Sequence, residues 1–172
     1  MKIVVGEGSC GIAAGAAKVY DKLASALDKS NELTITGCIG MCFLEPIVDI
    51  YDNGTTRLVK VSENDCERIA KAVNSDDLST VEDLKISEDD ELFLKKQTRI
   101  ALRHCGIINP EKISDYENTD GYKAVRKVLS EMTPEQVIEE IKISGLAGRG
   151  GAGFPTWFKW NAARSSDGTE KY

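Results

Sequence analysis

The residues with the most distinctive chemical pattern form a glycine-rich stretch near the C-terminal end of the chain. Five glycines fall between Gly145 and Gly153, and Arg149 stands among them. Glycine lets backbone amides come close to a ligand and adopts positive φ without a steric penalty. Consecutive N–H groups in such turns form anion-binding concavities, and an arginine adds a planar fork for a phosphate. The stretch therefore predicts a cradle for a phosphate or a nucleotide.

The spacing Gly148-x-Gly150-x-x-Gly153 also matches a dinucleotide fingerprint, but that fingerprint needs a strand before it and a helix after it. Here a helix is expected first, which disfavours a Rossmann turn. A purely structural turn, with Lys159 as a solvated surface charge, is the alternative. Phe154 is either a core residue or a stacking surface for a nucleotide ring. The later aromatic residues are interpreted as packing residues: Trp157, Phe158 and Trp160.

The run from Gly148 to Thr156, Gly-Arg-Gly-Gly-Ala-Gly-Phe-Pro-Thr, followed by Lys159 and Trp160, resembles the signature of NADH-binding flavoprotein subunits. That family includes the FMN subunit of respiratory complex I and related subunits of multimeric hydrogenases and formate dehydrogenases. The resemblance implies FMN and NAD(H) as cofactors. It places the following residues in their shared pocket: Gly148, Arg149, Gly150, Gly151, Ala152, Gly153, Phe154 and Lys159. One departure is Trp157, which stands where the family usually has glycine.

The N-terminal part is similar to the thioredoxin-like [2Fe–2S] module that often precedes this family. Such a cluster takes four thiolates, two per iron, and the module supplies them as Cys-x4-Cys after the first strand and Cys-x3-Cys after the second. Cys38 and Cys42 match the second pair, and Cys10 matches the latter half of the first. The position of the missing partner is Val5. The resemblance thus assigns Cys10, Cys38 and Cys42 as metal ligands, one short of a full set.

Four interpretations of these cysteines are open. The cluster is lost, or it binds with a non-cysteine fourth ligand such as Glu7, Ser9 or a residue of a partner. Zinc at three cysteines would lack a nearby histidine. Disulfide exchange is disfavoured because a thioredoxin motif needs Cys-x2-Cys. The remaining cysteines and the single histidine are interpreted as structural: Cys66 as a core residue, Cys105 and His104 as loop residues.

Residues 1–73 predict a small thioredoxin-like α/β domain in the order β-α-β-β-β-α. The expected strands are Ile3–Val5, Leu33–Thr36, Pro46–Tyr51 and Leu58–Val61, and Cys10 is expected in a loop. The expected helices carry apolar residues from Ala16 to Leu27 and, after a Ser62 cap, from Cys66 to Val73. Asn53-Gly54 predicts a hairpin.

Residues 74–96 are interpreted as an acidic linker, because eight acids and one base lie between Asn74 and Leu92. Residues 97–172 are expected to be the incomplete start of an α/β FMN/NADH-binding domain. It would open with an extended segment over 97–102 and a helix from Gly121. A second helix, capped by Thr133, would bury a stripe of three residues and end at Gly145. The stripe consists of Val137, Ile138 and Ile141.

The family continues with a second flavin loop and a cysteine cluster for a [4Fe–4S] centre, so the chain is expected to be the N-terminal portion of a longer, truncated protein. The implied function is hydride transfer from NADH to FMN, with electrons leaving singly through iron–sulfur clusters. The implied partners are other subunits of a multimeric oxidoreductase, and the piece alone is expected to be inactive. The alternative is a non-catalytic thioredoxin-like docking or assembly module that has lost its cluster.

Composition and charge exclude some classes of function. The 172 residues carry a net charge of −6 and 41% hydrophobic residues, and outside the acidic stretch the charges nearly balance. No basic face for nucleic acid is expected. No apolar run approaches the roughly 18 residues that span a bilayer, so membrane insertion is not expected either. Five cysteines, an odd number, favour a reducing compartment, and the start of the chain shows no signal-peptide pattern. A cytoplasmic location is the expectation.

Overall fold

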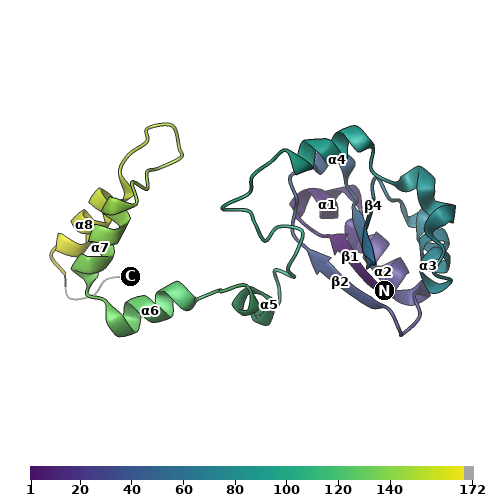
Figure 1. The fold of residues 1–172 in the computed structure, drawn as a ribbon, viewed down its shortest axis with the longest axis horizontal. Coiled ribbons are helices and arrows are strands. Elements are labelled where there is room, and N and C mark those ends of the chain that lie inside the picture. The colour runs from purple at the N-terminus through teal and green to yellow at the C-terminus, as the bar shows by residue number, and fades with distance from the viewer. Residues whose placement is uncertain (169–172) are drawn as a thin grey trace. The chain divides into compact units, whose positions relative to one another are not determined.

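The computed structural model describes residues 1–168, and the chain divides into two compact units, residues 1–119 and the part from residue 120 onward (Figure 1). The first unit is mixed α/β, as predicted for the N-terminal domain. Its elements, in chain order, are β1 (Lys2–Gly6), α1 (Ser9–Ala14), α2 (Ala16–Ala26), β2 (Glu32–Thr36), the 3₁₀ helix η1 (Cys42–Leu44), β3 (Val48–Asp52), β4 (Gly54–Leu58), η2 (Glu63–Asp65), α3 (Cys66–Asn74), η3 (Leu78–Leu84), α4 (Glu88–Lys95) and α5 (Ile113–Asn118).

The first unit is built on a four-stranded sheet in the order β2-β1-β3-β4. Strands β1 and β2 are parallel, whereas β3 is antiparallel to both β1 and β4. The predicted hairpin is present, since Asp52 pairs with Gly54 around Asn53. The observed return strand, β4, ends at Leu58, whereas the predicted return strand began at Leu58. The observed strand lies earlier in the chain because its pairing with β3 starts directly at the tight turn.

One face of the sheet carries the main hydrophobic core. Ile3 and Val5 alternate on β1 toward this face, and each is 0% exposed. The apolar sides of α2 and α3 pack against them, as the helical spacing predicted. Cys66, at the start of α3, is fully buried in this core, which confirms its interpretation as a core residue.

The other face of the sheet is covered by the segment at 106–109. The Thr36 hydroxyl donates a hydrogen bond to the Ile108 carbonyl at 2.9 Å, and the Asn109 amide donates to Thr34 Oγ1 at 3.1 Å. These bonds satisfy polar groups that the sheet would otherwise bury unpaired. The segment expected to open the second domain thus packs on the first unit. Residues 100–106 form turns and bends rather than the extended segment predicted for 97–102.

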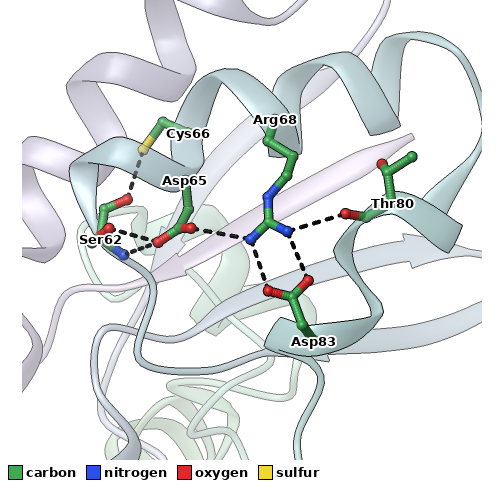
Figure 2. A network of polar contacts seen from close by, with 6 residues as sticks. All are labelled: Ser62, Asp65, Cys66, Arg68, Thr80 and Asp83. Atoms are coloured by element: carbon green, nitrogen blue, oxygen red, sulfur yellow. Dashed lines mark hydrogen bonds and ion pairs between the residues drawn. The ribbon is translucent and has the colours of Figure 1, made fainter.

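The acidic stretch at 74–96 is not a free linker. It folds as η3 and α4, and Val81 is fully buried in the main core. Figure 2 shows how α3 holds it: Arg68 donates two hydrogen bonds to the Asp83 carboxylate, at 2.7 and 3.0 Å, and one to the Thr80 carbonyl. The linker was predicted from the charges of the stretch alone, and the prediction overlooked the regularly spaced apolar residues that pack the stretch against the core.

In the second unit, the residues from 120 to 168 hold three helices: α6 (Lys123–Glu131), α7 (Pro134–Ile143) and α8 (Thr156–Ser165). The predicted capping box is present, with Thr133 Oγ1 accepting the Gln136 N–H and the Gln136 side chain accepting the Thr133 N–H. Gly145 follows α7 with φ of 65°, as expected for a C-terminal glycine.

Two expectations for this unit are wrong. The stripe predicted to be buried on α7 is only half-buried (Val137, Ile138 and Ile141). The described part is helical, and its strand-like pairing is limited to a single bridge between Ala147 and Pro155, so it does not show the α/β character expected of it. Residues 169–172 of the expected domain lie outside the described residues. Within residues 1–168, none of the helices combines the length and the apolar character needed to cross a bilayer.

Candidate functional site

Three cysteine thiols meet at one edge of the first unit. Cys10 lies on α1, directly after β1, and Cys38 follows β2, with Cys42 beginning η1. Because β1 and β2 are adjacent and parallel, their carboxyl ends lie at the same edge and the segments after them meet. The Sγ atoms of Cys10 and Cys38 are 3.3 Å apart, those of Cys38 and Cys42 are 3.6 Å apart, and all three lie within 4.8 Å of one another.

Glycines allow this close approach. An added Cβ on Gly8 would stand 2.7 Å from the Cys38 Cβ and 2.8 Å from its backbone nitrogen. On Gly11 it would stand 2.1 Å from the Gly6 carbonyl oxygen. The segment around Cys10 was expected to be a loop, but it forms the short helix α1, because Gly15 with φ of 106° ends one helix and starts the next.

The thiols of Cys10 and Cys38 differ in acidity. Hydrogen bonding with Cys38 and Cys42 holds the pKa of the Cys10 thiol below the ordinary value, although burial opposes this. Burial raises the pKa of the Cys38 thiol to about 12, an effect only partly offset by the Gly40 N–H, which donates to its sulfur at 3.3 Å. Cys10 is therefore the more acidic of these two thiols.

Glu45 is a functional candidate that the sequence analysis missed. Its side chain is 8% exposed, its Oε1 lies 4.0 Å from the Cys10 sulfur, and its Oε2 accepts the Ile47 N–H at 3.0 Å. Burial raises the pKa of this carboxyl, with a further rise from the Asp49 charge and an opposing hydrogen bond from Ile47. A signal was available, because Glu45 is the single charged residue between Thr36 and Asp49.

Glu7, one of the alternative fourth ligands, does not join the thiols. In the described part of the chain, the group of ligand atoms within 4.8 Å of one another contains the three cysteines and neither Glu7 nor any other acid. Ser9 is exposed. Burial and the charges of Glu111 and Asp21 raise the pKa of the Glu7 carboxyl.

Val5, the position of the absent fourth cysteine, is 0% exposed in the hydrophobic core. A four-thiolate [2Fe–2S] cluster needs one thiolate more than this site contains. The residues of this chain therefore do not fit that cluster in its four-cysteine form. His104 and Cys105 lie in the turns that precede the 106–109 segment, and His104 accepts a hydrogen bond from Arg103 at 3.0 Å.

The glycine-rich loop of the second unit stands open to solvent. Its base is closed by two backbone hydrogen bonds, from Gly148 N to the Phe154 carbonyl at 2.8 Å and from Thr156 N to the Leu146 carbonyl at 3.0 Å. Residues 148–155 are exposed, and Gly151 and Gly153 have φ of 99° and 60°. A helix precedes the loop, as expected, and α8 follows it at once.

The aromatic and basic residues after the loop pack on one another. Lys159 Nζ lies 5.7 Å from the Phe154 ring centroid, and the Phe154 and Phe158 rings meet edge to face with centroids 5.5 Å apart. Trp157 lies under the Lys142 ammonium at 5.5 Å. Its large ring therefore turns toward α7. The nucleotide-binding roles predicted for Gly148 to Phe154 and for Lys159 stay predictions.

The fold and site define an α/β module with a three-cysteine cluster, joined to a helical segment that bears a glycine-rich loop. No protein-family profile matches the chain. It is nevertheless homologous to the N-terminal region of NADH-oxidising subunits of hydrogenases and NADH-quinone oxidoreductases.

Two relatives illustrate the homology. The chain is 54% identical over 78 residues to the HndC subunit of the NADP-reducing hydrogenase of Solidesulfovibrio fructosivorans, covering 45% of this chain and 16% of the relative. It is 44% identical over 73 residues to a subunit of the NADH-quinone oxidoreductase of Rhizobium meliloti, covering 42% of this chain and 17% of the relative. The matched segments thus span about a sixth of each relative, and both relatives are subunits of larger enzymes.

Among solved structures, the chain is similar to a thioredoxin-like [2Fe–2S] ferredoxin from Aquifex aeolicus, with 21% identity and a TM-score of 0.45. The similarity covers 50% of this chain and 89% of that one.

Proposed function

We propose that the chain serves as the N-terminal part of an NADH-oxidising flavoprotein subunit and that its glycine-rich loop holds the phosphate of a flavin or nicotinamide nucleotide. One observation carries the proposal: residues 148–155 are exposed, and the loop is closed only at its base. Amides presented in this way at positive-φ glycines are available to a phosphate. The homology to NADH-oxidising subunits supports the same assignment.

Within this proposal the residues of the chain bind and orient the nucleotide. Backbone N–H groups from Gly148 to Gly153 donate to the phosphate, and the exposed Arg149 side chain adds a planar pair of donors. Lys159, held over the Phe154 ring, places a cation beside the end of the loop. When bound, FMN would supply the acceptor for a hydride from NADH and would pass electrons on singly to iron–sulfur clusters. The partners would be the other subunits of a cytoplasmic multimeric oxidoreductase.

The test is a fluorescence titration of the full chain with FMN and, separately, with riboflavin, which lacks the phosphate. We expect the fluorescence to be quenched at lower concentrations of FMN than of riboflavin. Arg149→Gln should weaken FMN binding about tenfold, because a charged hydrogen bond is lost. Lys127→Gln removes an exposed charge from α6 and is the control. Equal affinities for FMN and riboflavin would reject the phosphate cradle.

A second function is favoured by a separate observation. Val5 fills the core position where a fourth cysteine is expected, so the first unit is short of one thiolate. This supports a non-catalytic docking or assembly module that has lost its cluster. Iron and sulfide analysis, with an electron paramagnetic resonance spectrum of the dithionite-reduced, anaerobically prepared chain, separates the two functions. A [2Fe–2S] signal would reject the docking module, and an iron-free, silent chain would support it.

A further inference from the structure

A cavity of about 500 Å³ lies in the first unit, on the face of the sheet opposite the main core. Its floor is the β3–β4 hairpin, where Tyr51 stands directly opposite Thr55 and both border the cavity together with Arg57. Its walls are α4 and residues 99–107. The Tyr51 hydroxyl joins floor to wall, because it donates a hydrogen bond to the Gly106 carbonyl at 3.3 Å. Proteins hold small molecules in cavities of about 300–1,000 Å³, so this cavity has room for a ligand.

The cavity has a surplus of positive charge. Four basic side chains and one acid line it. Three of the four bases are paired with a carboxylate, in the ion pairs Arg57–Asp49, Lys85–Glu82 and Lys95–Glu91. The fourth base, Arg99, donates a hydrogen bond to the Ile39 backbone carbonyl, which carries no formal charge. Within residues 1–168, no carboxylate forms an ion pair with Arg99, so one positive charge remains unbalanced.

The Arg99 guanidinium is placed to receive an anion. It is half-buried, and the Ile39 carbonyl holds it at the cavity wall through one of its nitrogens. A guanidinium has five N–H donors in a planar fork, so donors are left for a ligand. Two of them can bind both oxygens of a carboxylate, which a lysine ammonium cannot do in the same geometry. A single carboxylate would also balance the one surplus charge.

The lining of the cavity also contains apolar side chains. Ile86 and Leu94 are half-buried and pack against a small hydrophobic cluster that includes Ile39. Ile107 lines the cavity and is 64% exposed. An apolar group seated here would remove hydrocarbon surface from water and so favour binding. The ligand should therefore carry an apolar body as well as an acid.

From these observations we propose that this cavity binds a small organic carboxylate with an apolar body, of the size of a medium-chain fatty acid. Arg99 would receive the carboxylate, and Ile86, Leu94 and Ile107 would cover the apolar body. The bound ligand would join α4 and residues 99–107 to the β3–β4 hairpin. This site is separate from the three cysteines and from the glycine-rich loop, so its occupancy does not depend on the function proposed above.

The test is an isothermal titration of the full chain with octanoate and, separately, with octanamide, which has the same hydrocarbon but no charge. We expect one octanoate per chain and about tenfold weaker binding of octanamide, because charged hydrogen bonds are lost. Arg99→Gln should weaken octanoate binding about tenfold as well and leave octanamide binding unchanged. Arg103→Gln is the matched control, since it alters an exposed arginine of the same turns that does not line the cavity.

The position of the ligand is checked in the parent chain, so that this readout does not depend on the folding of a variant. Cys105 lines the cavity, whereas Cys42 does not. Saturating octanoate should slow the labelling of Cys105 by iodoacetamide severalfold and leave the labelling of Cys42 unchanged.

Four results would overturn the inference. The first two are the absence of saturable octanoate binding and equal affinities for octanoate and octanamide. The third is a folded Arg99→Gln chain that keeps the parent's affinity for octanoate. The fourth is labelling of Cys105 that saturating octanoate does not slow, because the ligand would then be bound elsewhere.

Discussion

Arg57 donates two hydrogen bonds of 2.7 Å to the carboxylate of Asp49, its directly opposite partner across the β3–β4 hairpin. The Asp49 side chain is 3% exposed and that of Arg57 is 20% exposed. This bidentate pair therefore lies largely out of water, next to the face of the sheet that the 106–109 segment covers. Because of this geometry, loss of this ion pair should destabilise the first unit more than loss of its other ion pairs.

Replacing Arg57 by methionine should lower the free energy of unfolding by about 3–5 kcal/mol, because the buried Asp49 carboxylate loses its partner. The double variant Asp49→Leu/Arg57→Met should recover most of this loss, since no charge remains buried. Urea denaturation followed by circular dichroism measures both. Equal losses in the single and double variants would show that the charge is not the cause.

Asp65 should make the first unit sensitive to acid (Figure 2). Burial raises the pKa of its carboxyl, but hydrogen bonds from the Ser62 hydroxyl and N–H and from Arg68 outweigh burial, so the net pKa is below 3.8. The folded state then binds fewer protons than the unfolded state. The stabilisation is fully present above the unfolded-state pKa and is lost as the pH falls through the lower folded-state pKa.

Asp65→Asn should therefore lower the free energy of unfolding by about 1 kcal/mol at neutral pH. The difference from the parent should vanish once the pH is below the folded-state pKa of Asp65. Denaturation of the parent and the variant over a pH series measures this difference. Asp21→Asn, on the exposed side of α2, is the control. A penalty that stayed constant down to the lowest pH would contradict the role of the charge.

Gly8→Ala should displace the Cys38 segment, because the new methyl group would lie 2.7 Å from the Cys38 Cβ. The backbone of Gly8, with φ of −65° and ψ of 167°, is allowed for alanine, so the contact alone is the cause. We expect a loss of about 1–3 kcal/mol in the free energy of unfolding. Diamide should also form the Cys10–Cys38 disulfide more slowly.

Gly37→Ala is the matched control, since an added Cβ there meets no atom within 4 Å. Thermal unfolding and peptide mapping of the disulfide give the two readouts. Should Gly37→Ala cost as much as Gly8→Ala, the close approach of Gly8 to Cys38 is not what holds the thiols together.

The cysteines should differ in their reaction with iodoacetamide. Cys66 is 0% exposed, and burial raises the pKa of its thiol, so it should react only after unfolding. Cys42 is exposed and should be labelled in the native chain. Timed labelling with mass mapping of the peptides measures both. Labelling of Cys66 as fast as Cys42 without denaturant would show that the core opens readily.

The local elements were predictable because their signals lie within a few residues of each other. The Asn53-Gly54 turn, the Thr133 capping box and the helical apolar spacing of α2 are each complete within one turn or one helix. The segments that were mispredicted depend on distant contacts. The turns after 97 are held against the sheet by bonds from Thr36 and Asn109, more than 70 residues apart from their partners.

The residues of the candidate site also divide into those found from the sequence and those that only the structure revealed. Cys10, Cys38 and Cys42 were assigned from a resemblance in spacing, and the structure brings them together because two parallel strands end side by side. Glu45 was not found, because its isolated charge between Thr36 and Asp49 does not reveal that it lies near Cys10, 35 residues away. The acidic stretch was misread because the burial of Val81 depends on α2, α3 and the sheet.

By itself, the amino-acid sequence determined the Asn53-Gly54 hairpin turn, the Thr133 cap and the helical segments α2 and α3. These properties depend on hydrogen bonds and steric limits between near neighbours. Only the tertiary structure decided that Glu45 faces the thiols, that Val5 faces the core and that the acidic stretch packs on α3. Such contacts depend on which surfaces are buried together, and burial is a property of the whole folded chain.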